Sequence, residues 1–208
     1  FARSASIAMV AVDEAHCISQ WGINFRPSYL KIAEFIDRLA YRPVISAFTA
    51  TATSRVKQDI AELLKLDDPF TLTTGFNRKN LFFGVERPKS KFKTLLEYLR
   101  RYEGRSGIVY CATRKTVDKL EHELNSLDLG ATKYHAGLTD EERAENQRDF
   151  MYDEKTVMVA TNAFGMGIDK SNVSFVIHYN MPKNIESYYQ EAGRAGRDGG
   201  EADCILLY

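Results

Sequence analysis

The sequence has few cysteines and no long apolar run. Its three cysteines, Cys17, Cys111 and Cys204, lie more than 90 residues apart, so no two have metal-ligand spacing and one is left over from any disulfide. We expect reduced thiols in or near the core. No run of about 18 apolar residues occurs, and the first residues lack the basic and then apolar order of a signal peptide. These absences predict a cytoplasmic protein, nucleoid-associated if bacterial, without a membrane segment.

Neither sign of charge is in excess, because 28 Lys and Arg residues balance 28 Asp and Glu residues. This balance argues against a polycationic nucleic-acid binder or a membrane-surface protein. The distribution is uneven, since residues 78–115 carry 11 basic and 3 acidic side chains. Most of these basic residues fit a solvated helix face and a linker, and contact with nucleic acid is the alternative.

Apolar runs of strand length alternate with longer segments of helical period, which predicts an α/β fold with parallel sheets flanked by helices. Thr53 or Ser54 is expected to cap one helix, and Thr139 with Glu142 has the pattern of a capping box. Most of the strands have the composition of fully buried strands. The expected strands are 8–12, 44–48, 81–85, 108–111, 157–160, 173–179 and 204–208, and the expected helices are 29–39, 54–66, 90–102, 115–127 and 140–152.

A turn-rich stretch at residues 73–80 predicts a domain boundary. The part before it has only two expected strands, too few for a complete doubly wound sheet, whereas the part after it has about five or six. We therefore expect residues 1–76 to be the carboxyl-terminal part of one domain and residues 77–208 to be a nearly complete second domain.

Two adjacent carboxylates, Asp13 and Glu14, follow the apolar strand that ends at Val12. Ligands of open α/β sheets bind beyond the carboxyl ends of the strands. One carboxylate can hold Mg²⁺ and its neighbour can orient or deprotonate water for phosphoryl transfer. The alternative is a pair of capping carboxylates. The string of residues 13–16 after a buried strand favours a nucleotide site.

Residues 17–27 have neither helical nor strand period and include Trp21, Phe25 and Arg26. Aromatic and arginine side chains on a loop can stack on the bases of a single strand. Trp21 and Phe25 can equally anchor the loop to the core, and composition does not decide between these interpretations. After the next strand, the hydroxyl-rich residues 49–53 can bond the acidic site or cap a helix.

In the second part, the strand ending at Ala160 leads into Thr161 and a loop with two glycines, whose amides could meet phosphate. Residues 188–199 then place Arg194 and Arg197 three apart among three glycines. We expect these guanidinium groups to be exposed on a flexible loop, where they could grip phosphate oxygens as an arginine finger does.

Taken together, these strings resemble the RecQ family of superfamily 2 DNA helicases through essentially the whole chain. The aromatic loop at residues 17–27 is peculiar to that family. The other matches are residues 13–16 with motif II, 49–52 with motif III, 108–114 with motif IV, 134–137 with the short motif after it, 161–169 with motif V and 190–199 with motif VI.

The resemblance implies RecA-like parallel sheets, with a partial first lobe and a nearly complete second lobe. It implies an ATP-dependent helicase that moves 3′ to 5′ on single-stranded DNA and unwinds duplex DNA in repair and recombination, as two lobes close and open around ATP and Mg²⁺.

The resemblance also implies roles for single residues. Asp13 would bind Mg²⁺, Glu14 would activate water and His16 would couple the ATP site to DNA. In motif VI, Arg197 would be the arginine finger, Arg194 a second phosphate or interlobe contact and Gln190 a polar member of the same interface. The nucleotide site would include Asp169, and DNA would meet Trp21, Phe25, Arg26 and Thr161.

The sequence departs from the family pattern in two respects. Ile23 and Asn24 stand where the family loop frequently has His and Asp. None of the 13 glycines is followed by Lys, so there is no Gly-Lys-Ser/Thr phosphate loop, and we expect this chain alone to bind ATP poorly and hydrolyse none. A superfamily 2 RNA helicase and a non-catalytic binding module are the alternatives.

Overall fold

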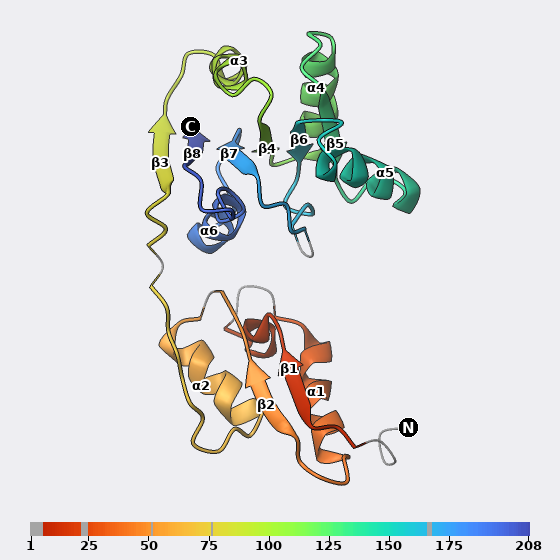
Figure 1. The fold of residues 1–208 in the computed structure, drawn as a ribbon, viewed down its shortest axis with the longest axis vertical. Coiled ribbons are helices and arrows are strands. Elements are labelled where there is room, and N and C mark those ends of the chain that lie inside the picture. The colour runs from red at the N-terminus through yellow and green to blue at the C-terminus, as the bar shows by residue number, and fades with distance from the viewer. Residues whose placement is uncertain (1–5, 22–24, 51, 76, 166–167) are drawn as a thin grey trace. The chain divides into compact units, whose positions relative to one another are not determined.

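The computed structural model describes residues 6–21, 25–50, 52–75, 77–165 and 168–208. The chain forms two compact units, Phe1–Gly75 and Phe76–Tyr208. Each unit has its own sheet and is described by itself (Figure 1). The assignment of residues 1–76 and 77–208 to two helicase lobes stays a prediction.

The first unit contains a two-stranded parallel sheet in which Met9 lies opposite Val44 and Val12 opposite Ala47. Val12, Ile18 and Ile60 belong to one buried cluster that joins this sheet to its helices. The elements are β1 (Met9–Val12), the 3-10 helix η1 (Ala15–Ile18), α1 (Pro27–Asp37), β2 (Val44–Ala47) and α2 (Ser54–Leu63).

The strands of the first unit are less buried than their composition predicts. Met9 is 56% exposed and Val44 is 63% exposed. The prediction of fully buried strands is wrong here because each strand of a two-stranded sheet has a neighbour on only one side. Helix α2 begins as expected, since the Thr53 hydroxyl accepts the N–H of Val56 at 3.3 Å.

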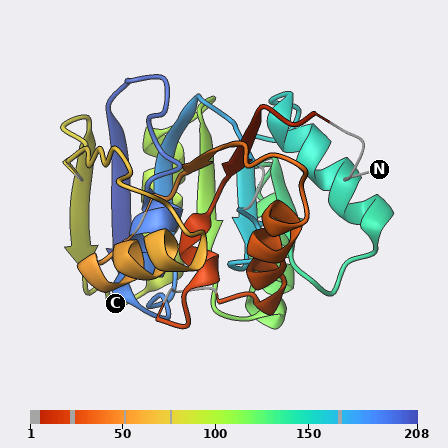
Figure 2. The same cartoon turned by 90° about the horizontal axis from the view of Figure 1, so that it is seen from below.

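Among the described residues of the second unit, six strands form one sheet, and all of them pair in parallel. In both views the strands lie side by side in the same order (Figures 1 and 2). Across the sheet they are β3 (Leu81–Glu86), β8 (Ala202–Leu207), β7 (Val173–His178), β4 (Ser106–Tyr110), β6 (Val157–Ala160) and β5 (Ala131–Tyr134).

Helices bury both faces of this sheet, as parallel sheets require. One buried cluster includes Leu95 and Leu99 of α3 (Lys91–Arg101) and Val117, Leu120 and Leu124 of α4 (Arg114–Asn125). A second cluster includes Phe150 of α5 (Asp140–Met151) and Ala192 of α6 (Ile185–Ala192). The α/β, RecA-like fold is thus confirmed.

Several local expectations are confirmed as well. Thr139 and Glu142 form both hydrogen bonds of the capping box at α5. Cys17, Cys111 and Cys204 are buried free thiols. Within the described residues, no helix combines the length and apolarity needed to span a membrane.

Three elements escaped prediction, η1, β5 and α6. Strand β5 has the sequence Ala-Thr-Lys-Tyr, with too few apolar residues to give a strand signal. Helix α6 precedes a glycine-rich segment that reads as loop. In addition, β3 is not fully buried, since Phe82 is 63% exposed, because β3 lies at an edge of the sheet.

Gly107 gives a test of how tightly the two middle strands approach. It lies opposite Phe175 in the β4–β7 pairing, and a Cβ atom on Gly107 would be 2.1 Å from the Phe175 ring. We expect Gly107→Ala to lower the free energy of unfolding by about 1–3 kcal/mol, because the buried ring must move. Urea unfolding followed by circular dichroism measures this loss.

Gly75→Ala is the matched control for Gly107→Ala, because a Cβ atom on Gly75 would have no neighbour within 4 Å. Equal stability of the two variants would contradict the packing described for the middle of the sheet.

Candidate functional site

The acidic pair lies where the chain turns sharply at the carboxyl end of β1. Glu14, the N-cap residue of η1, has φ 48° and ψ 41°, the left-handed conformation. Non-glycine residues rarely adopt this conformation, and such strain is concentrated at functional sites. The Asp13 carboxylate accepts the Glu14 N–H at 2.8 Å. The turn therefore presents two carboxylates from consecutive residues.

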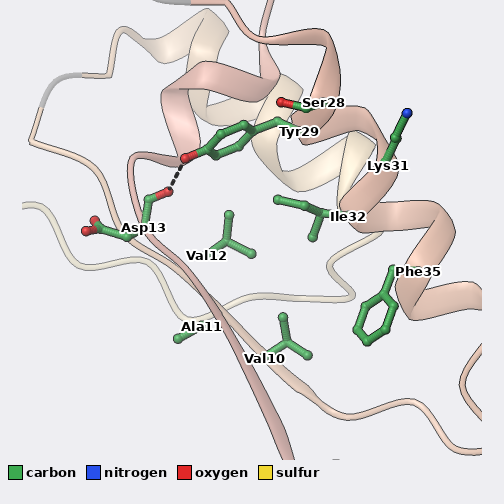
Figure 3. Close-up of a pocket in the computed structure, with 9 residues that line it drawn as sticks. All are labelled: Val10, Ala11, Val12, Asp13, Ser28, Tyr29, Lys31, Ile32 and Phe35. Atoms are coloured by element: carbon green, nitrogen blue, oxygen red, sulfur yellow. Dashed lines mark hydrogen bonds between the residues drawn. The ribbon is translucent and has the colours of Figure 1, made fainter. Parts of the chain in front are cut away.

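Helix α1 supports this turn from the side. The Tyr29 hydroxyl donates to the carbonyl of Asp13 at 3.3 Å (Figure 3). A groove beside the turn is lined by residues of β1 and α1 that include Val10, Ile32 and Phe35. The Asp13 carboxylate points away from these apolar side chains, so it stays available for a polar ligand (Figure 3).

His16 links the acidic turn to the segment that follows β2. Its side chain is buried, and Nδ1 lies 2.9 Å from Oγ1 of Thr49 and 3.2 Å from Oε2 of Glu14. The N–H of Ala15 also donates to the Phe48 carbonyl at 2.9 Å. Burial lowers the pKa of His16 below its ordinary value, and the charge of Glu14 opposes this shift. His16 is therefore neutral near pH 7 and can bridge the two segments by hydrogen bonds.

The aromatic loop is held by helix α2. Ser19 is fully buried, and its hydroxyl donates to Oδ2 of Asp59 at 2.5 Å and accepts the N–H of Trp21 at 3.1 Å. The guanidinium of Arg55 lies over the Trp21 ring, 5.1 Å from its centroid. Because Arg55 and Asp59 are four residues apart, both contacts come from one face of α2.

The loop leaves its tryptophan open to solvent. Trp21 is 68% exposed, so its ring does not anchor the loop in the core, whereas Phe25 and Arg26 are half-buried. The N–H of Arg26 donates to the Cys17 carbonyl at 2.9 Å and closes the base of the loop. Ile23 and Asn24, whose identities depart from the family pattern, lie outside the described residues.

In the second unit, the expected motifs V and VI meet. Arg194 donates from Nη1 to the Gly165 carbonyl at 2.6 Å. Arg197 donates from Nη1 to Oδ1 of Asp169 at 2.7 Å and to the carbonyl of Ile168 at 3.2 Å. The structure thus brings Asp169 and both arginines together.

The expectation of two exposed arginines on a loop is confirmed for Arg197 and is wrong for Arg194. Tyr188, Gln190 and the residues up to Ala192 belong to α6 rather than to a loop. Arg194 is half-buried, and its Nε is buried without a hydrogen bond to any described residue. The side chain of Arg197 is 36% exposed. The loop carbonyls of motif V hold both groups, which glycine content alone does not reveal.

A buried polar pair secures α6 against the sheet. Nε2 of His178, at the end of β7, lies 2.8 Å from Oε2 of Glu191, and His178 is 1% exposed. Sequence reasoning missed both residues, because a histidine at the end of a strand and a glutamate in a helix are common. Their signal is visible only once burial is known.

Further polar groups lie at the carboxyl edge of the six-stranded sheet, and neither Asn180 nor Asp118 among them was singled out from the sequence. Asn180 accepts the N–H of Ala112 at 3.1 Å through its side chain. His135 lies 3.1 Å from Asp118 through Nε2 and accepts the N–H of Gly137 through Nδ1. Thr161, an expected DNA contact, is mostly buried, and its N–H donates to the Tyr134 carbonyl at 3.1 Å. These loops therefore share one edge.

The donor set fits Mg²⁺ bound together with phosphate. Within the described residues, no group of three or more His, Cys, Asp or Glu side chains could hold a metal ion by itself. Mg²⁺ is usually held by one or two carboxylates plus phosphate oxygens and water, which needs only an exposed carboxylate such as Asp13. Oε2 of Glu14 is buried and accepts no hydrogen bond from a described residue, so its capacity as an acceptor is unused.

Comparison with known proteins agrees with this geometry. The model of the helicase conserved C-terminal domain matches residues 90–199. The chain is 51% identical over 206 residues to the ATP-dependent DNA helicase RecQ of Bacillus subtilis, covering 99% of this chain and 35% of that protein. The chain belongs to the RecQ helicase family. A second relative is the ATP-dependent helicase wrn-1 of Caenorhabditis elegans, which is 47% identical, with 97% of this chain and 20% of that protein covered.

This RecQ-family chain spans about a third or less of the length of these relatives. Among solved structures, Saccharomyces cerevisiae Dbp5 L327V bound to RNA and ADP BeF3 superposes with a TM-score of 0.77 at 25% identity, covering 97% of this chain and 53% of Dbp5. The superposition supports the RecA-like fold. Membership of the helicase family implies ATP use, while the roles of single residues stay predictions.

Asp59 gives a test of how the aromatic loop is held. We expect Asp59→Ala to lower the free energy of unfolding of the first unit by about 1–2 kcal/mol, because the buried Ser19 hydroxyl loses its acceptor. The fluorescence of Trp21, the only tryptophan of the chain, follows urea unfolding of this unit.

Glu62→Ala is the control for Asp59→Ala, since it removes an exposed carboxylate from the same helix. Unchanged stability of Asp59→Ala relative to Glu62→Ala would mean that the Ser19 contact does not hold the loop.

Proposed function

We propose that this chain is part of an ATP-dependent DNA helicase that couples ATP hydrolysis to 3′-to-5′ movement on single-stranded DNA and to duplex unwinding, in repair and recombination. The observation that carries the proposal is the strained turn at the carboxyl end of β1, which presents the carboxylates of Asp13 and Glu14. Membership of the RecQ family supports it, since the B. subtilis relative is named an ATP-dependent DNA helicase.

In the first unit, Asp13 would hold Mg²⁺ and Glu14 would accept the proton of the attacking water. Bound Mg²⁺ would neutralise the charge that develops on the phosphates. Support comes from the exposed carboxylate of Asp13 and from the buried Oε2 of Glu14, which accepts no hydrogen bond from a described residue. His16 would transmit changes at this turn to the segment after β2, because it contacts Thr49.

In the second unit, Arg197 would donate to the γ-phosphate as the arginine finger and Arg194 would make a second phosphate or interlobe contact. Gln190 would be a polar member of that interface. The ion pair of Arg197 with Asp169 supports this role, because the exposed Asp169 carboxylate orients the guanidinium and can be exchanged for phosphate oxygens.

DNA would meet the aromatic loop and motif V. The exposed ring of Trp21 can stack on a base, a contact worth about 1–3 kcal/mol. Phe25 and Arg26 would support it from within the loop, and Thr161 would contact the strand from the second unit. An RNA helicase is not favoured, because the RecQ relatives are named DNA helicases.

Glu14→Gln tests the acidic pair in the full-length protein that contains this chain. We expect ATP turnover to be lost while ATP affinity stays within about threefold, because the amide keeps the shape of the carboxylate but cannot accept the proton. The measurements are steady-state hydrolysis with single-stranded DNA and equilibrium binding of a fluorescent ATP analogue. Glu34→Gln, at an exposed position of α1, is the control. Normal turnover by Glu14→Gln would remove the proposed role.

Arg197→Ala tests the arginine finger in the same assay. We expect turnover to fall by about 10³ or more, because a finger stabilises charge that develops in the transition state. Arg105→Ala removes an exposed arginine from the same unit and should leave turnover unchanged. A fall of less than tenfold for Arg197→Ala would show that another group supplies this charge.

A further inference from the structure

Arg78, just before β3, donates hydrogen bonds to residues 193–196, the segment that carries Arg194 and leads to Arg197. Its Nη1 donates to the Gly193 carbonyl at 3.5 Å. Its Nη2 donates to the carbonyls of Ala195 at 3.1 Å and Gly196 at 2.6 Å. One planar guanidinium therefore serves three carbonyls along residues 193–196.

Asn80, two residues after Arg78, also donates hydrogen bonds to this segment. Its Nδ2 donates to the carbonyls of Gly196 and Gly200, each at 2.8 Å. Its Oδ1 accepts from Nε of Arg78 at 3.3 Å, so the two side chains also orient each other. The backbone carbonyl of Asn80 accepts the N–H of Ala202 at 3.0 Å, which places the contact at the start of the β3–β8 pairing.

The segment is shaped to admit these side chains. Gly196 has φ +57°, and a Cβ atom there would lie 2.5 Å from Nδ2 of Asn80 and 2.7 Å from the Gly200 carbonyl. The N–H of Gly196 donates to the Val173 carbonyl at 2.8 Å. Any side chain at position 196 would thus break the close approach of Asn80.

Arg78 also lies at the carboxyl end of α6. The last carbonyls of a helix have no partner within the helix, and a cation is favourable there because of the helix dipole. Gly193 is the C-cap residue of α6. Arg78 supplies a donor to the Gly193 carbonyl and a positive charge at this end.

We propose that Arg78 and Asn80 are positioning residues for ATP hydrolysis. They fix the backbone on which Arg194 and Arg197 stand, and thereby fix the direction of both guanidinium groups. The proposal rests on the role proposed above for Arg197. Neither side chain needs to touch the nucleotide.

The charge of Arg78 is not enough for this role. A lysine has a single ammonium group, which cannot reach three carbonyls with the geometry of a guanidinium fork. Arg78→Lys therefore keeps the cation at the end of α6 and removes most of the hydrogen bonds. Asn80→Ala removes the hydrogen bonds from Asn80 to this segment without a change of charge.

The test measures DNA-stimulated ATP hydrolysis by the full-length protein. For Arg78→Lys and Asn80→Ala we expect kcat to fall about tenfold while KM for ATP stays within about threefold, because a misdirected finger weakens the transition state more than binding. Lys79→Ala is the control, since Lys79 is exposed and lies between the two residues. Unchanged kcat for both variants would overturn the proposal.

A double variant separates positioning from general destabilisation. In an Arg197→Ala background we expect Arg78→Lys to cause much less than the tenfold loss that it causes alone, because most of its effect acts through Arg197 and only the part that acts through Arg194 remains. A full additional tenfold loss would overturn the proposal. If Arg197→Ala alone turns over normally, the role of Arg197 falls and this proposal falls with it. If Arg197→Ala lowers turnover but Arg78→Lys and Asn80→Ala do not, the role of Arg197 stands and only the positioning role is wrong.

Discussion

Parallel pairing is the constraint on which the arrangement of both units depends. Every strand pair is parallel, so each strand needs a long connection before the next one, and all strands of a sheet end at the same edge. The acidic turn follows β1, the hydroxyl-rich segment follows β2, and the loop of motif V follows β6. The groups proposed to act on ATP and DNA therefore come from loops, while the buried strands fix where those loops begin.

Buried polar contacts then give these loops their direction. His16 joins the ends of β1 and β2, Ser19 ties the aromatic loop to α2, and Arg78 with Asn80 holds the segment after α6. In each case one partner is the backbone or a short side chain, so the loop has little conformational freedom. A buried donor without an acceptor is costly, which makes each contact specific for one loop conformation.

The sequence predicted most of the fold because strand runs and helix caps are local signals. It placed Asp13 and Glu14 at the end of a strand for the same reason. It failed where the partner is distant, since Arg78 and Asn80 bond carbonyls 115 to 120 positions away. Glycine content suggested a mobile loop for Arg194, whereas the carbonyl of Gly165, 29 residues earlier, holds its guanidinium. Such contacts form only once the sheet is assembled, and they produce no periodic pattern in the sequence.

The buried thiols of the second unit have a consequence for their chemistry. Burial raises the pKa of Cys111 to about 12 and that of Cys204 to about 12. Very few of these thiols are then thiolates at pH 7, and the thiolate is the reactive form. Electrophiles can modify these sulfur atoms at an appreciable rate only while the surrounding helices separate from the sheet. The rate at which these thiols are alkylated therefore reports how often this unit opens transiently.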